Sequence, residues 1–167
     1  MFNLNKNLQE YLKSFKFKNK KISGILSVIP KHCVKFIDEM DNYGFSKEKS
    51  LSLQKVMGFD ERRIVEGNEC ASDLVLYGME YLLSKGKIQK DEISALILIT
   101  QTPDHFIPPT SAILHGKLGL NRDVLCFDIN QGCAGYLYGI LQSFLLLEVS
   151  PRGKVVLLNC DTLSRKA

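Results

Sequence analysis

The residues whose types and spacing best suit chemistry lie at positions 127–141, FDINQGCAGYLYGIL, where Cys133 stands among small residues. A strand-like apolar run enters this segment and a helix-like run leaves it, so we expect Cys133 at a bend before a helix. A helix N-terminus supplies free N–H groups and partial positive charge, which stabilise a thiolate and a developing oxyanion. Gly132, Ala134 and Gly135 leave room for a substrate to approach the sulfur. The segment predicts a nucleophilic cysteine; a buried structural cysteine at a tight turn is the open alternative.

The other four cysteines are predicted to be structural. Cys126 and Cys160 fall inside apolar, strand-like runs, where a cysteine acts as a small buried side chain. Cys33 and Cys70 have no neighbour at C-x-x-C spacing, so a zinc or thioredoxin-like site is not expected. We therefore expect no metal, and reduced thiols in a cytoplasmic protein.

Alternating helix and strand patterns must position Cys133. Helices are predicted at 71–85, 110–119 and 133–148, and buried strands at 95–100, 124–129 and 154–160. Short connections between them imply right-handed crossovers and a mainly parallel sheet covered on both faces. The helix at 133–148 is apolar nearly all round, so we expect it in the middle of a domain with Cys133 at the floor of a tunnel.

The first part of the chain gives weaker signals. A strand is predicted at 20–29, stopped by Pro30, followed by a helical turn at 34–41 and a short helix from Lys47 that ends near Gly58. Residues 1–19 are predicted to be a basic N-terminal extension with helix-like spacing, and residues 20–167 one domain.

Charge and hydropathy exclude several function classes. The net charge of +4 comes from the lysines of residues 1–21, and the remainder is nearly neutral. Nucleic-acid binding is not expected, because no basic face with clustered arginines is present. Neither a signal peptide nor a transmembrane helix is predicted, since the apolar runs are interrupted.

Four segments, in the same order, resemble 3-oxoacyl-(acyl-carrier-protein) synthase III of the thiolase-like superfamily. The similarity runs from about Lys21 to Lys166 and corresponds to the N-terminal half of such enzymes. The segment FDINQGCAGYLYGI is similar to the family's D-x-x-x-x-C-A-G-F motif and places the family's nucleophile at Cys133. The other three segments are GFDERRIVEGNE (58–69), ALILITQTPDHFIPPTSAILHGKLGL (95–120) and VVLLNCDTLSR (155–165).

This resemblance implies an α/β fold class, namely the first half of a duplicated α/β/α layered fold with a mostly parallel mixed sheet. Cys133 is expected to take an acyl group from acyl-CoA or acyl carrier protein. A malonyl thioester then decarboxylates and attacks the acyl-enzyme to form a 3-oxoacyl thioester. Gly132, Ala134 and Gly135 are expected to line the substrate pocket, and Ile107 to reach across a homodimer interface. No cofactor other than these thioester substrates is expected.

The chain departs from the family at several positions. The catalytic His and Asn of the second half have no counterpart, because His32, His105 and His115 do not match them. The chain as given is therefore expected to be a fragment that does not condense. The family's CoA-binding Trp and Arg align with Ser52 and Val56, which cannot hold a nucleotide, so a carrier-bound donor is plausible.

Two alternatives remain open. The first is a non-catalytic thiolase-like half domain that acts as a subunit or interaction partner. The second is a cysteine hydrolase of another α/β family, which needs a histidine such as His105 or His115 within reach of Cys133.

Overall fold

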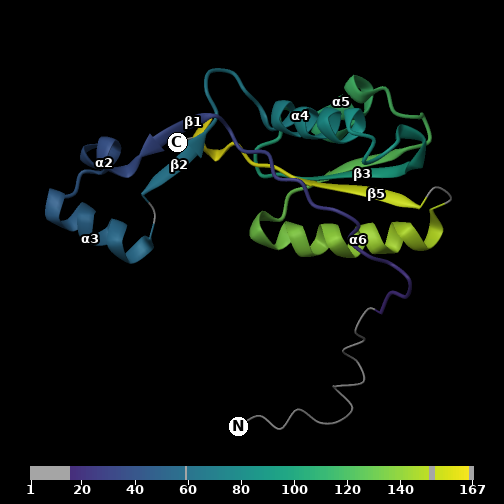
Figure 1. The fold of residues 1–167 in the computed structure, drawn as a ribbon, viewed down its shortest axis with the longest axis horizontal. Coiled ribbons are helices and arrows are strands. Elements are labelled where there is room, and N and C mark those ends of the chain that lie inside the picture. Colours follow the sequence, from purple (N-terminus) through teal and green to yellow (C-terminus); the bar gives the residue numbers. More distant parts are fainter. Residues whose placement is uncertain (1–15, 59, 151–152, 166–167) are drawn as a thin grey trace, which may run out of the picture.

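The computed structural model describes residues 16–58, 60–150 and 153–165 and shows an α/β fold. A parallel sheet has the strand order β4 (Leu125–Ile129), β3 (Ile93–Ile99), β5 (Lys154–Asn159). Helices α4 (Ala71–Ser84) and α5 (Thr110–Leu118) cover one face, and α6 (Gly135–Val149) lies along the other (Figure 1). The predicted alternation of helices and strands is confirmed, as are the helix ends at Gly119 and near Gly86.

The central strand β3 is buried over its whole length, as its continuous apolar run predicts. The expectation of full burial is wrong for the other two strands. β4 and β5 are only half-buried, because each has a strand neighbour on one side alone among the described residues. The core lies between the sheet and the two helices α4 and α5. Its buried members are Val75, Met79, Ile93, Leu96, Leu98, Leu114, Leu118, Leu120 and Val124.

A smaller lobe extends from one end of the layered part (Figure 1). Strands β1 (His32–Lys35) and β2 (Glu61–Ile64) form an antiparallel pair. Between them lie α2 (Phe36–Glu39), the 3-10 turn η1 (Met40–Tyr43) and α3 (Lys47–Met57), which ends at Gly58 as predicted.

Within this lobe, the guanidinium of Arg62 donates two hydrogen bonds to Glu39, one of them 3.1 Å long. This pair raises the pKa of Arg62 and lowers that of Glu39. β2 is thereby tied to the end of α2.

The prediction of a strand at 20–29 is wrong. The segment is extended, but no strand of the described chain pairs with it, so it forms no ladder. Its Leu26 and Val28 side chains instead lie against Gly78 of α4. The first paired strand begins after Pro30, at His32. The helix expected within 1–19 falls almost wholly outside the described residues.

Helix α6 approaches the sheet through two glycines one turn apart. A Cβ atom on Gly135 would lie 2.5 Å from Cγ2 of Ile99, and one on Gly139 would lie 2.6 Å from Cδ1 of Leu157. Both distances are shorter than real Cβ contacts, so a side chain at either position would have to push the Ile99 or Leu157 side chain aside. The backbone of α6 is therefore held close to β3 and β5.

The opposite face of α6 is exposed, and the expectation of a helix buried all round is wrong. Gly135 and Gly139 are its buried residues, whereas Leu137 is 69% and Val149 77% exposed. The cause is that one sheet covers one face only. By length and composition alone, the stretch Gly132–Val149 is apolar enough to cross a membrane. A helix that is buried between two layers of a protein has the same length and composition.

Replacement of Gly139 by alanine tests the close contact. We expect Gly139→Ala to lower the free energy of unfolding by up to about 2 kcal/mol, because overpacking costs roughly 1–3 kcal/mol and the helix gain from alanine offsets only about 1 kcal/mol of it. Chemical denaturation followed by circular dichroism measures this difference.

The matched control is Gly116→Ala in α5, where a Cβ atom meets nothing within 4 Å. This variant should be stabilised by about 0.5–1 kcal/mol. If the two variants change stability in the same direction, the close approach of α6 to the sheet is wrong.

Candidate active site

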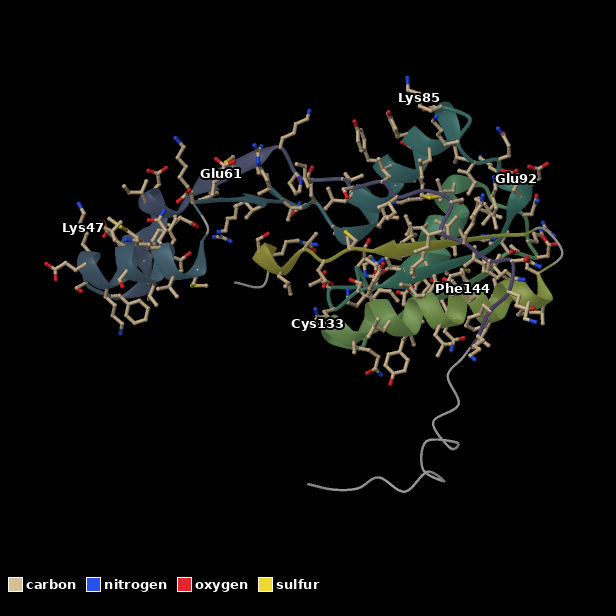
Figure 2. All side chains as sticks on the ribbon, turned by 60° about the horizontal axis from the view of Figure 1, so that its bottom comes forward. Lys47, Glu61, Lys85, Glu92, Cys133 and Phe144 are labelled. Carbon is tan, nitrogen blue, oxygen red and sulfur yellow. The ribbon has the colours of Figure 1, made fainter. Side chains whose placement is uncertain are left out.

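Cys133 lies at a bend that joins the sheet to α6. β4 ends at Ile129, and the 3-10 turn η3 (Gly132–Ala134) leads directly into α6; we call residues 130–135 the elbow. Gly132 has φ +52°, in the left-handed region that favours glycine. Figure 2 shows Cys133 at the start of α6. The predicted strand-turn-helix bend is therefore confirmed.

The side chain of Cys133 is exposed rather than at the floor of a tunnel, so that expectation is wrong for this chain. The uncovered outer face of α6 is the physical reason, because no second layer closes over the elbow. The first N–H groups of α6, which lack partners within a helix, lie next to Cys133 in the chain. Ala134 is also exposed, whereas Gly135 is buried against Ile99.

A hydrogen-bond network joins the carboxyl ends of β3 and β5, at the edge of the sheet where the elbow lies. Oδ1 of Asp161 accepts hydrogen bonds from the backbone N–H of Gln101 (2.6 Å) and from the hydroxyl of Thr100 (3.1 Å). Oδ2 accepts a third from Nε2 of Gln101 (3.0 Å). The backbone N–H of Thr162 donates to Oγ1 of Thr102 (2.9 Å). These bonds fix the segments that follow the two strands.

Two other aspartates brace the loop at 101–109. Asp128 of β4 accepts hydrogen bonds from the backbone N–H groups of Thr110 (2.8 Å) and Ser111 (2.9 Å), and so caps α5. Asp104 accepts one from the N–H of Ser72 (3.3 Å) at the start of α4. The loop between these braces presents Ile107, which is 89% exposed. A pocket-lining role for Ile107 stays a prediction.

The environments of the other cysteines differ from that of Cys133. Burial raises the pKa of Cys160 to about 11, and burial together with Asp128 raises that of Cys126. Partial burial and the Glu61 carboxylate raise the pKa of Cys33. Both Cys126 and Cys160 pack against the core but are only half-buried. Cys70 is the N-cap residue before α4, and its sulfur accepts a hydrogen bond from Nη1 of Arg165 (2.7 Å).

The histidines are not brought to the elbow by any contact in the described chain. His32 pairs with Glu66 (3.1 Å), and Nε2 of His115 lies 2.9 Å from the carbonyl oxygen of Asn121. His105 is exposed in the braced loop. Among the described hydrogen bonds none joins a histidine to Cys133, so the hydrolase alternative has no support from geometry.

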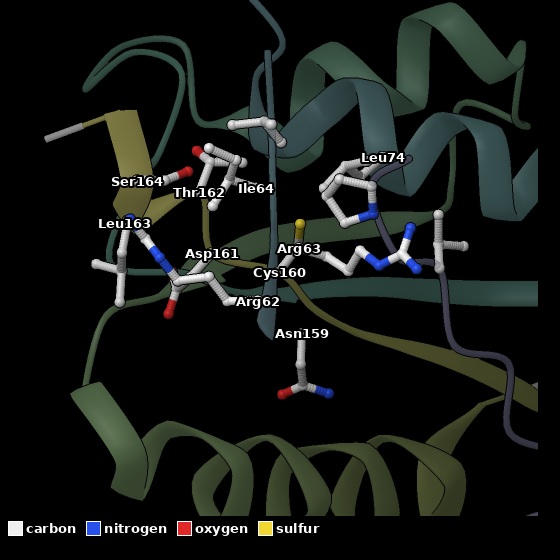
Figure 3. Close-up of a pocket in the computed structure, with 13 residues that line it drawn as sticks. Arg62, Arg63, Ile64, Leu74, Asn159, Cys160, Asp161, Thr162, Leu163 and Ser164 are labelled. Carbon is white, nitrogen blue, oxygen red and sulfur yellow. The ribbon is translucent and has the colours of Figure 1, made fainter. Parts of the chain in front are cut away.

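A cavity of about 350 Å³ lies near the carboxyl end of β5 (Figure 3). Its walls come from β2, from the extended segment at Val28 and Pro30, and from residues 159–164. Asp161 lines it, whereas Cys133 does not. Within the described ranges, no three His, Cys, Asp or Glu side chains gather as a metal ion requires.

The sequence patterns predicted a role for Cys133 but none for Asp128, Asp161 or Gln101. Asp128 and Asp161 both fall inside the family-like segments, and that was the only signal available. Their partners are 17 or more positions away in the chain, so spacing alone does not reveal them.

Sequence comparison relates this chain to named enzymes, although no protein-family profile matches it. It is 39% identical over 151 residues to a Campylobacter jejuni protein provisionally named 3-oxoacyl-[acyl-carrier-protein] synthase 3. The matched region covers 90% of this chain and 42% of that protein. It is 31% identical over 127 residues to the β-ketoacyl-[acyl-carrier-protein] synthase III of Fusobacterium nucleatum, covering 74% of the chain and 38% of that protein. The chain thus spans about two fifths of the length of these relatives.

Solved structures give the same result for the fold. The 3-oxoacyl-(acyl-carrier protein) synthase of Burkholderia xenovorans superposes with a TM-score of 0.70 at 30% identity, over 78% of this chain and 37% of that one. The synthase III of Thermus thermophilus superposes with a TM-score of 0.70 at 29% identity, over 86% of this chain and 44% of that one. In sequence and in its thiolase-like fold, the chain belongs to the 3-oxoacyl-[acyl-carrier-protein] synthase III family.

Proposed function

We propose that the protein to which this chain corresponds is a condensing acyltransferase of fatty-acid synthesis, with Cys133 as its acyl-accepting nucleophile. The observation that carries this proposal is the exposed thiol of Cys133 at a left-handed glycine turn, directly before a helix N-terminus. The family relationship supports the same chemistry.

The first step is transfer of an acyl group. The Cys133 thiolate attacks the carbonyl carbon of an acyl thioester, and N–H groups at the start of α6 stabilise the negative oxygen that forms. The bond between the carbonyl carbon and the donor sulfur then breaks, and the donor leaves as a thiolate. Cys133 is left as an acyl thioester.

The second step is condensation with a malonyl thioester, which loses carbon dioxide to give a carbanion that attacks the acyl carbonyl carbon. The bond between that carbon and the sulfur of Cys133 then breaks, which releases the 3-oxoacyl thioester and returns Cys133 as a thiolate. The resemblance assigns this step to a His and an Asn that this chain does not match. We therefore assign acyl transfer to the described elbow and condensation to the full-length enzyme.

Acyl carrier protein is the proposed partner, since it stands in the names of the related enzymes. Ser52 and Val56 lie one turn apart on α3, where both are exposed and neither offers a surface for a nucleotide. A carrier-bound donor therefore suits this chain better than acyl-CoA. The full-length enzyme is proposed to be a homodimer, with the exposed Ile107 reaching the partner's pocket.

Alkylation tests the reactivity of Cys133. With iodoacetamide at pH 8, we expect Cys133 to react fastest of the five cysteines. Cys160, with a pKa of about 11, is thiolate in only about one molecule in a thousand at that pH. As the pH rises toward 11, Cys160 gains reactivity because its thiolate fraction grows. Peptide mass spectrometry after timed quenching gives the five rates.

Cys70 is the main competitor, and Cys70→Ser is the matched control. Its sulfur is half-buried and in contact with Arg165, so it should react second. The fast phase should survive in Cys70→Ser and vanish in Cys133→Ser. Equal rates at all five cysteines, or a fast phase without Cys133, would contradict the assignment.

Acyl transfer is tested directly by intact-mass measurement. Incubation with an acyl thioester should add one acyl group to the wild-type chain and to Cys33→Ser, but none to Cys133→Ser, because a serine hydroxyl is not ionised near neutral pH. An acyl group bound to acyl carrier protein should be transferred to the chain faster than one bound to CoA. An adduct that persists in Cys133→Ser would disprove Cys133 as the acceptor.

The second candidate function is that of a non-catalytic half domain that acts as an interaction partner. The exposed apolar face of α6 favours it, because a patch of this kind is normally covered by another surface. This candidate and the first both require a partner for α6.

The apolar face predicts concentration-dependent self-association of the chain, measured by sedimentation velocity. Leu145→Lys with Val149→Lys should shift it toward monomer, because lysine on that face is not easily buried. Tyr77→Lys with Tyr81→Lys, on the exposed side of α4, is the matched control and should leave association unchanged. A chain that stays monomeric at all concentrations would contradict the need for a partner.

A further inference from the structure

We propose that Asp161 is a positioning residue for the elbow and acts through Gln101, an inference that rests on the proposed function of Cys133. Asp161 does not touch the sulfur in any described contact. Its effect is to set which end of the Gln101 amide faces the turn that carries Cys133.

Asp161 holds Gln101 at two points. The carboxylate accepts the backbone N–H of Gln101 through Oδ1 (2.6 Å) and the side-chain Nε2 through Oδ2 (3.0 Å). A third bond, from the hydroxyl of Thr100, orients the carboxylate itself (3.1 Å). A glutamine side chain loses substantial rotational freedom when it is fixed, so an interaction at both ends is what makes one orientation persist.

The direction of the Gln101 amide follows from the chemistry of its partner. A carboxylate only accepts hydrogen bonds, so it takes the NH₂ end of the amide. The carbonyl end then points to the elbow, where Oε1 lies 3.7 Å from the position of a Cβ atom on Gly132. An amide at position 161 also donates and would permit the reverse orientation.

Both ends of the elbow are thereby set by the carboxyl end of β3. Gln101 faces Gly132, and Ile99, two residues earlier, lies against Gly135. Gly132 begins η3 and Gly135 follows it, so the two glycines lie on either side of Cys133. Gly135 packs tightly against Ile99, and this packing depends on no charge, whereas the amide that faces Gly132 is oriented by Asp161. Asp161 therefore controls the part of the elbow's surroundings that a change of charge can alter.

The test is the pH profile of Cys133 alkylation by iodoacetamide in the full 167-residue chain. We expect Asp161→Asn to lower the rate constant at pH 7.5 by about tenfold, because small displacements of a reacting group cost one to two orders of magnitude. Asp161→Glu, which keeps the carboxylate, should recover part of the rate. Asp91→Asn removes a similar exposed charge at the opposite end of β3 and should give the wild-type profile.

The sign of the change separates positioning from simple charge. Removal of a nearby negative charge favours a thiolate, so a purely electrostatic role predicts faster alkylation in Asp161→Asn. Gln101→Leu keeps the Asp161 charge and should slow the reaction as much as Asp161→Asn does. The double variant should lose little more, because both changes break one connection. A faster reaction in Asp161→Asn, or losses that add fully, would overturn the inference.

Hydrogen–deuterium exchange separates this inference from the proposed function. If Cys133 reacts no faster than Cys70 in the wild-type chain, the nucleophile assignment fails, and peptides over residues 130–136 then decide the structural claim. Faster exchange there in Asp161→Asn than in Asp91→Asn, with similar melting temperatures, supports the positioning role. Equal exchange in these two variants overturns it.

Discussion

The contact between α6 and the sheet is the constraint on which the rest of the structure depends. A Cβ atom on Gly135 or Gly139 would enter the space of Ile99 or Leu157, so the helix lies closer to β3 and β5 than a helix with larger residues allows. The same helix starts at the elbow. Its close packing therefore fixes where the chain turns after β4, and with it the position of Cys133. Stability and the proposed chemistry depend on one contact, which explains why glycines persist inside a helix at a cost of about 1 kcal/mol each.

Three aspartates organise the edge of the sheet around that contact. Asp104 and Asp128 satisfy N–H groups at the starts of α4 and α5, which have no partner within their own helices. Asp161 serves Gln101 instead, because the segment after β3 enters a loop rather than a helix. Each carboxylate thus accepts a backbone N–H at the start of a helix or just after a strand. Within the described chain these bonds order the edge of the sheet beside Cys133.

Sequence patterns predicted the layered part well because its signals are local. The apolar run of β3, the glycine after α5 and the small residues around Cys133 each determine their own conformation. In the smaller lobe the helical turn and the helix that ends at Gly58 were predicted, but the strands were not, since β2 is only Glu61–Ile64 and carries charges instead of alternating apolar residues. The segment at 20–29 has strand composition, but no strand among the described residues pairs with it, and pairing depends on the tertiary fold. Asp161 and Gln101 were missed because 60 positions separate two residues that meet only after β3 and β5 pair.

The exposure of α6 and the exposure of Cys133 have one cause. A helix that is apolar on both faces is suited to a position between two layers, and only one layer lies against it here. Phe17 covers part of the open side through its ring contact with Phe144 (5.3 Å), and Lys20 pairs with Glu148 (3.3 Å), but Leu137 beside the elbow stays in water. A thioester on Cys133 would meet the same water. Under the proposed function, a second layer over α6 would both bury the apolar face and exclude water from the acyl-enzyme, so the completion of the core and the protection of the intermediate are a single structural event.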